Sequence, residues 1–174
     1  MNNIFVKTSH QLILKFLSDF TNNTFFEKEI AKKSGLSSGA TNSALKQLVK
    51  CNLVLLEKKG RMCFYSINSD SPVIKQWKVL GNIIKIVPMI ENLKDVSEKI
   101  ILFGSSKEGV NINESDMDLF VVTNSPKVVK KRMGNNKKIQ LITKTLLEFI
   151  ELKSQKSEFY EEVNRGIVLW EKTE

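Results

Sequence analysis

The sequence predicts an α+β protein made of two domains. In residues 1–70, three segments with apolar residues at helical spacing are followed by two short strands. In residues 97–174, short apolar runs bounded by turn residues alternate with amphipathic segments. The intervening residues 71–96 carry an apolar stripe at helical spacing, which indicates a helical connector.

Charge divides unevenly along the 174 residues. The chain has 27 Lys and Arg against 19 Asp and Glu, and its net charge is +8. The excess is denser over residues 1–70, as is typical of nucleic-acid binders, although solubility alone would also account for it. No apolar run approaches the ~20 residues that a membrane span needs, and the two cysteines lack metal-site spacing. We expect a cytoplasmic protein.

The first domain has a definite order of elements. Helices are expected over residues 9–20, with Ser9 as N-cap, then over 27–34 and from about 37 to 50. Strands are expected at 25–26, 53–57 and 62–67. Helix, helix, tight turn, helix and a hairpin with a basic tip is the order of a winged helix-turn-helix.

This region resembles the ArsR/MarR-type winged-helix regulators over residues 9–70. The resemblance is carried by Ile30-Ala31, Gly35-Leu36-Ser37, Ala44-Leu45, Leu48 and the hairpin 58–65. It implies contact with double-stranded DNA through the outward face of the third helix and through the hairpin tip. The implied DNA-contacting residues are Ser38, Thr41, Asn42 and Lys46 on the helix, and Lys58, Lys59 and Arg61 on the hairpin. Winged helices also serve as dimerisation or protein-docking modules, so that alternative stays open.

The connector begins at Pro72, a residue that suits the first turn of a helix. Pro88 should break or kink this helix near Ile84, or begin a second helix. Its stripe of Trp and Ile residues is typical of a core, and a homodimer interface is the alternative.

A two-part motif dominates the second domain. The apolar run 99–103 leads into Gly104-Ser105, where backbone N–H groups can approach a phosphate without a Cβ in the way. Ten residues later come Asp116 and Asp118, which are expected to project from the same face of one strand. Two such carboxylates can hold Mg²⁺, which completes its octahedron with phosphate and water. Together the two parts predict a nucleotide site.

The pattern Gly104-Ser105-x10-Asp116-x-Asp118 resembles the minimal nucleotidyltransferases of the DNA polymerase β superfamily over residues 95–172. Gly109, Ser115 and the segment from Phe159 to Trp170 fit as well. The resemblance implies a small α/β domain with a mixed sheet and Mg²⁺-dependent transfer from a nucleoside triphosphate such as ATP. It assigns the phosphates to Gly104, Ser105 and Lys107, and the metal to Asp116 and Asp118 as catalytic residues. One implied role is an antitoxin that transfers AMP to a hydroxyl of its cognate toxin protein.

The sequence departs from this family at two points. After Ser105, where a basic residue often appears, it has Ser106-Lys107-Glu108, so only Lys107 remains to meet phosphate. Nucleotidyltransferases of this kind carry a third carboxylate on a later strand, and here Gln140 stands about there, on the expected strand 138–143. An amide is a poor Mg²⁺ ligand and cannot act as a general base. Glu148 or Glu151, on the expected helix 146–152, could replace it. Alternatively, the protein is a DNA-binding transcriptional regulator whose second domain is degenerate, nucleotide-sensing or purely structural.

Overall fold

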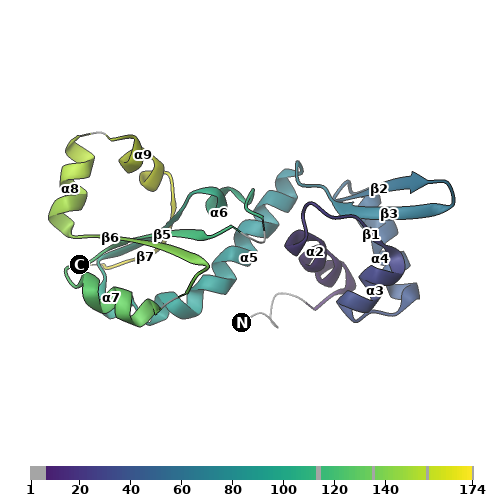
Figure 1. The fold of residues 1–174 in the computed structure, drawn as a ribbon, viewed down its shortest axis with the longest axis horizontal. Helices are drawn as coiled ribbons and strands as arrows, with labels where there is room; N and C mark the ends of the chain where they lie inside the picture. Colours follow the sequence, from purple (N-terminus) through teal and green to yellow (C-terminus); the bar gives the residue numbers. More distant parts are fainter. Residues whose placement is uncertain (1–6, 113–114, 135, 156, 174) are drawn as a thin grey trace. The chain divides into compact units, whose positions relative to one another are not determined.

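The computed structural model describes residues 7–112, 115–134, 136–155 and 157–173. The chain forms two compact units, Met1–Lys78 and Val79–Glu174 (Figure 1). Within the described residues, no helix has the length and apolar character needed to span a bilayer. The boundaries expected from sequence, at residues 70 and 96, remain predictions.

The first unit combines helices with a small antiparallel sheet. Its elements are α2 (Ser9–Asp19), β1 (Phe25–Phe26), α3 (Glu27–Ser34), α4 (Ser38–Lys50), β2 (Val54–Lys59) and β3 (Met62–Ile67). The strand order is β1-β3-β2, and β2 and β3 form a hairpin. Apolar residues of all three helices, including Leu17, Ile30 and Leu45, form the core.

Local capping explains where these helices start and stop. Gly35 takes a left-handed conformation (φ 67°) and ends α3. Ser37 accepts a hydrogen bond from the backbone N–H of Ala40 and so begins α4. The expected N-cap of α2 is wrong by one residue. Thr8 takes that place rather than Ser9, because it forms a reciprocal capping box with Gln11.

Helix α5 (Pro72–Glu91) is longer than expected. It begins at Pro72, as predicted, but it continues past Pro88 to Glu91. The predicted break near Ile84, and the alternative of a second helix beginning at Pro88, are therefore wrong. Ile86 and Ile90, on either side of Pro88, are fully or almost fully buried. Their burial contributes about 1.5–3 kcal/mol each, which offsets the ~3 kcal/mol cost of an interior proline.

The second unit is built on a four-stranded mixed sheet. After α5 and a short 3-10 turn η1 (Lys94–Val96), its elements are β4 (Lys99–Phe103), α6 (Ser105–Glu108), β5 (Met117–Val122), α7 (Pro126–Met133), β6 (Ile139–Lys144), α8 (Leu146–Ser154), α9 (Glu158–Asn164) and β7 (Ile167–Glu171). The strand order is β6-β5-β4-β7. β4 is antiparallel to both β5 and β7, whereas β5 and β6 are parallel. The α+β class and the mixed sheet are confirmed.

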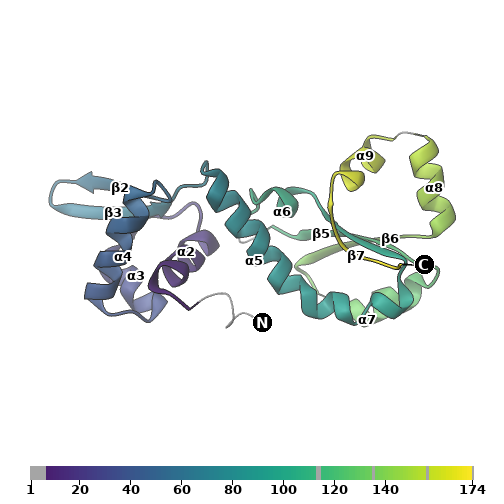
Figure 2. The same ribbon diagram turned by 180° about the vertical axis from the view of Figure 1, so that it is seen from behind.

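Helices cover both faces of this sheet. On one face, Ile100, Leu119 and Val121 pack with α7 and the later part of α5. On the other face, Ile101, Phe120 and Val122 pack with α8 and α9. Figures 1 and 2 show these two layers from opposite sides. Because Asp118 has the same parity as Phe120 and Val122, it lies on the α8/α9 face.

Candidate nucleotide site

Gly104 follows the last residue of β4 and lies beside the carboxylate of Asp118. It has φ 64° and ψ −157°, a conformation that side chains rarely adopt. A Cβ built on Gly104 would overlap Oδ2 of Asp118. Two features therefore favour glycine at this position: the positive φ, and the nearby carboxylate of Asp118, which leaves no room for a Cβ. The short helix α6 follows directly, so the Gly104-Ser105 turn lies against an acidic side chain.

The two aspartates differ in their surroundings. Asp118 lies in β5, opposite Phe103 in the register, and is partly buried. Asp116 is exposed and precedes the first residue of β5, so the expectation that both stand on one strand is wrong by one residue. Burial raises the pKa of Asp118, and the charges of Glu162 and Asp116 raise it further. A cation beside Asp118 would relieve this repulsion.

The carboxylates of Asp116 and Asp118 are suitable ligands for Mg²⁺. Among the described residues, no group of three or more His, Cys, Asp or Glu side chains is arranged to hold a metal ion. Mg²⁺ needs only one or two protein carboxylates when phosphates and water supply the remaining ligands. Asp118, which lies against the Cβ-free Gly104, and Asp116 two residues before it meet that requirement.

A cavity of about 530 Å³ opens beside the Gly-Ser turn. Its walls come from the turn and α6 on one side and from α9 on the other. The lining residues are Gly104, Ser105, Lys107, Glu108, Glu158, Glu161, Glu162 and Arg165. A volume of this size is within the range of small-molecule sites. The three residues predicted to bind phosphate therefore line one cavity.

Lys107 is the basic residue nearest to the turn in sequence. Its side chain is only 15% exposed, and its Nζ lies 3.2 Å from Oε1 of Glu108. It is thus held close to the Gly-Ser turn with its charge partly balanced. A phosphate in the cavity would compete with Glu108 for this ammonium group.

Gln140 lies directly beside Asp118. The two residues are register partners on the parallel strands β5 and β6, so their side chains leave the same face of the sheet. Gln140 is exposed. The position next to Asp118 therefore carries an amide.

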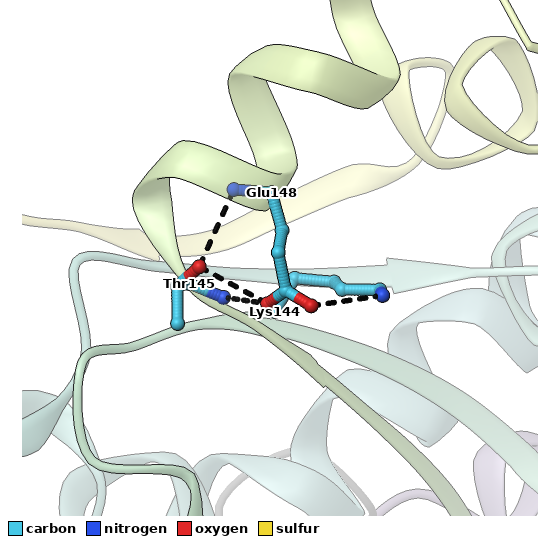
Figure 3. A network of polar contacts seen from close by, with 3 residues as sticks. All are labelled: Lys144, Thr145 and Glu148. Atoms are coloured by element: carbon cyan, nitrogen blue, oxygen red, sulfur yellow. Dashed lines mark hydrogen bonds and ion pairs between the residues drawn. The ribbon is translucent and has the colours of Figure 1, made fainter.

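Neither acidic residue considered on α8 lines the cavity. Thr145 is the N-cap of that helix, and Glu148 completes its capping box. Glu148 accepts hydrogen bonds from the backbone N–H of Thr145 (2.7 Å) and from its hydroxyl (3.0 Å), and pairs with Lys144 at 3.2 Å (Figure 3). These contacts, led by the backbone hydrogen bond, lower the pKa of Glu148. Glu151 is exposed and is not one of the residues that line the cavity.

Several residues near the site, including Glu108, Glu158, Glu161, Glu162 and Arg165 of the cavity lining, were not identified from the sequence. Glu162 of α9 lines the cavity. Glu158 and Glu162 each precede an inward-facing residue, Phe159 or Val163, and this spacing could have indicated that the two glutamates share one face of the helix. Asn82 of α5 donates to the backbone carbonyl of Ser106 (2.9 Å) and to Oδ1 of Asn111 (3.0 Å). No local sequence pattern predicts these hydrogen bonds from Asn82, which hold the segment that follows the Gly-Ser turn.

The residues predicted to contact DNA on α4 divide into two groups. Ser38 and Lys46 are exposed, and Asn42 is partly buried, with its amide donating to Glu27 at 2.7 Å. The expectation that Thr41 faces outward is wrong: it is fully buried, and its hydroxyl donates to the backbone carbonyl of Ser37 at 2.9 Å. Thr41 lies three and four residues before Ala44 and Leu45, so helical spacing places it on their inward face.

The exposed face of α4 also includes residues that the sequence reasoning did not name. Gly39, Ser43 and Lys50 are exposed and fall at helical spacing with Lys46. On the hairpin, Lys58, Lys59 and Arg61 are exposed, as expected. Lys59 pairs with Glu57 at 3.2 Å, and its Nζ lies 5.4 Å from the centre of the Phe64 ring.

A glycine turn against a carboxylate, an adjacent second aspartate and a mixed sheet define a nucleotidyltransferase-like domain. The chain belongs to the family described as "Polymerase beta, Nucleotidyltransferase", whose model matches residues 84–174. This confirms the resemblance inferred from the Gly-Ser and Asp-x-Asp pattern and supports a nucleotidyltransferase-like activity on a nucleotide substrate. No curated protein gave a significant match to the chain.

Proposed function

We propose that the chain is a cytoplasmic, Mg²⁺-dependent nucleotidyltransferase that uses ATP and carries a DNA-binding winged helix in its first unit. The observation that carries the proposal is the position of Gly104 against the carboxylate of Asp118, at the edge of a cavity large enough for a nucleotide. Phosphate binding and metal binding would thus take place within one site.

The residues around the cavity have distinct tasks in this proposal. Backbone N–H groups of the Gly104-Ser105 turn bind phosphate oxygens, because Gly104 brings no Cβ into their path. Lys107 adds a positive charge to the same wall of the cavity. Asp116 and Asp118 would hold Mg²⁺, and the bound ion would neutralise negative charge on the phosphates during transfer.

The direct test uses ATP labelled at the α-phosphate, with Mg²⁺ and total cell protein as the acceptor mixture. We expect label on protein with the wild type and none with Asp116→Ala. Asp95→Asn removes a carboxylate that pairs with Arg132 outside the cavity, and it serves as the matched control. Label transfer that persists in Asp116→Ala would contradict the site assignment.

The first unit supports the DNA-binding part of the proposal through its element order. Helices α3 and α4, joined by the Gly35-Leu36-Ser37 turn, precede the β2–β3 hairpin, which is the order of a winged helix-turn-helix. Lys46 and the three hairpin cations are exposed and available for phosphate contacts. Within this proposal, the acceptor is a protein hydroxyl of a cognate toxin, and the chain is the antitoxin.

The register of Gln140 with Asp118 favours a second candidate. In that case, the chain is a DNA-binding regulator whose nucleotidyltransferase domain senses nucleotide or is only structural. Calorimetry with ATP, with and without Mg²⁺, separates the candidates when it is combined with the labelling assay. Binding without transfer favours the sensor, whereas an absence of binding in wild type leaves only a structural role for the domain.

A further inference from the structure

We propose that Glu162 of α9 supplies the third carboxylate of the site and accepts the proton of the attacking hydroxyl. This inference rests on the proposed nucleotidyl transfer and deepens it. Proton acceptance is thereby assigned to helix α9, because strand β6, next to Asp118, carries only the amide of Gln140 at that position.

The packing of α9 fixes which of its faces meets the cavity. The Phe159 ring lies 6.0 Å from that of Phe103 and 5.9 Å from that of Phe120, between ring centres. Val163, four residues after Phe159, is 1% exposed. Phe103 immediately precedes Gly104, and Phe120 follows Asp118 by two residues. The strand segments that carry the site therefore also anchor the helix that carries Glu162.

Glu162 then lies on the cavity wall that faces the Gly-Ser turn. It lines the cavity together with Gly104 and Ser105, and Gly104 lies against the Asp118 carboxylate. Glu162 is itself solvent-exposed, so a proton that it accepts can pass to water.

The other acidic residues near the cavity fit this task less well. Glu108 is paired with Lys107. Glu158 and Glu161 line the cavity, but helical spacing places both farther than Glu162 from the inward face of α9 that Phe159 and Val163 define. Glu148 is committed to the cap of α8. Glu162 is thus the cavity carboxylate nearest to the face of α9 that packs against the strands of the site.

The oxygen of the acceptor hydroxyl forms a bond to the α-phosphorus of ATP. The bond from that phosphorus to the oxygen bridging the α- and β-phosphates breaks, and pyrophosphate leaves with the bonding pair. The hydroxyl proton passes to the Glu162 carboxylate, which later releases it to solvent.

The experiment compares the wild type with Glu162→Gln, Glu151→Gln and the double variant Glu162→Gln/Gln140→Glu. Each protein is assayed for label transfer from ATP to total cell protein, and for ATP affinity in the presence of Mg²⁺ by calorimetry. Glu151→Gln removes the same charge from an exposed helix position outside the cavity. We expect Glu162→Gln to lower transfer by about 10²–10⁴-fold, the usual contribution of a general base, with ATP affinity changed less than ~3-fold.

The double variant provides the stricter test. Gln140→Glu places a carboxylate in register with Asp118, on the same face of the sheet, and should restore part of the transfer lost in Glu162→Gln. A parallel loss of ATP affinity in Glu162→Gln would overturn the proton-accepting role, because it would indicate a binding role instead. Unchanged transfer in that variant would overturn the inference while leaving the proposed function intact. An absence of transfer in the wild type would overturn both.

Discussion

Gly104 lies against the carboxylate of Asp118, and the space that a Cβ would need is filled by Oδ2 of that side chain. We therefore predict that Gly104→Ala displaces Asp118 and lowers Mg²⁺-dependent ATP affinity roughly tenfold or more, since small misplacements at such sites are costly. The φ of 64° adds a backbone penalty of about 1–3 kcal/mol. Calorimetry and urea denaturation measure the two effects separately.

Gly134 is the matched control for this substitution. Its backbone angles (φ 59°, ψ −167°) are close to those of Gly104, but an added Cβ would meet no non-neighbouring atom of the described residues within 4 Å. Gly134→Ala should show the stability loss without the loss of ATP affinity. Equal effects of the two substitutions on ATP affinity would show that the overlap with Asp118 has no consequence.

Asp118 should make the protein less stable when no cation is bound. Its raised pKa means that the folded state holds the proton more tightly than the unfolded state, so the free energy of unfolding falls as pH rises through the interval between the ordinary and the raised value. We predict that Asp118→Asn raises the melting temperature at pH 7 in the absence of Mg²⁺ and abolishes the additional stabilisation by Mg²⁺ and ATP. Thermal denaturation with and without these ligands measures both.

Asp95→Asn should behave in the opposite way. The side-chain hydrogen bond from Arg132 lowers the pKa of Asp95, so the ionised form is favoured in the folded state. The substitution should lower stability slightly and leave the response to Mg²⁺ and ATP intact. A fall in melting temperature for Asp118→Asn as well would contradict the repulsion inferred around Asp118.

The sequence predicted those parts of the fold and site that depend on local pattern. Gly104 and Asp118 were found because strand ends, small residues and paired carboxylates have fixed spacings along the chain. Strand β6 was located to within one residue, which placed Gln140 on it, and the structure sets Gln140 in register with Asp118. The inward face of α4 was predicted from Ala44, Leu45 and Leu48.

The errors arose where a residue's environment is set by packing. Pro88 was expected to interrupt a helix, but burial of Ile86 and Ile90 outweighs its local preference. Thr41 was judged by its polarity, although its hydroxyl is satisfied by the carbonyl of Ser37. The place of Glu162 in the same cavity as Gly104 depends on how α9 packs on the sheet, which no spacing between residues 104 and 162 encodes.

The cap of α8 should make stability depend on pH in acid. Hydrogen bonds from Thr145 and Lys144 lower the pKa of Glu148 from its ordinary value of 4.5 (Figure 3). The resulting stabilisation is present above that value and is lost as pH falls through the lowered pKa of the folded state. We predict that Glu148→Gln has a smaller loss of stability between pH 5 and pH 3 than the wild type. Denaturation midpoints across this range measure it, and Glu151→Gln, on the same helix but outside the network, should keep the wild-type slope.

The exposed cations of the β2–β3 hairpin should govern the salt dependence of DNA binding. Lys58, Lys59 and Arg61 are exposed, and each phosphate contact contributes about −0.9 to the slope of log K against log salt. Changing all three to Gln should reduce that slope by up to about 3 units in fluorescence anisotropy titrations with duplex DNA. The same measurement on Lys172→Gln, an exposed lysine of the second unit, should leave the slope unchanged.

Comparing Thr41→Val with Lys46→Gln separates the effects of the buried face of α4 from those of its exposed face. Thr41→Val removes the hydrogen bond to the carbonyl of Ser37 and should lower stability by about 1 kcal/mol. Because Thr41 is fully buried, DNA affinity measured well below the melting temperature should not change, whereas Lys46→Gln should weaken it. DNA affinity that depends on Thr41 but not on Lys46 would place the contact surface on another face of the first unit.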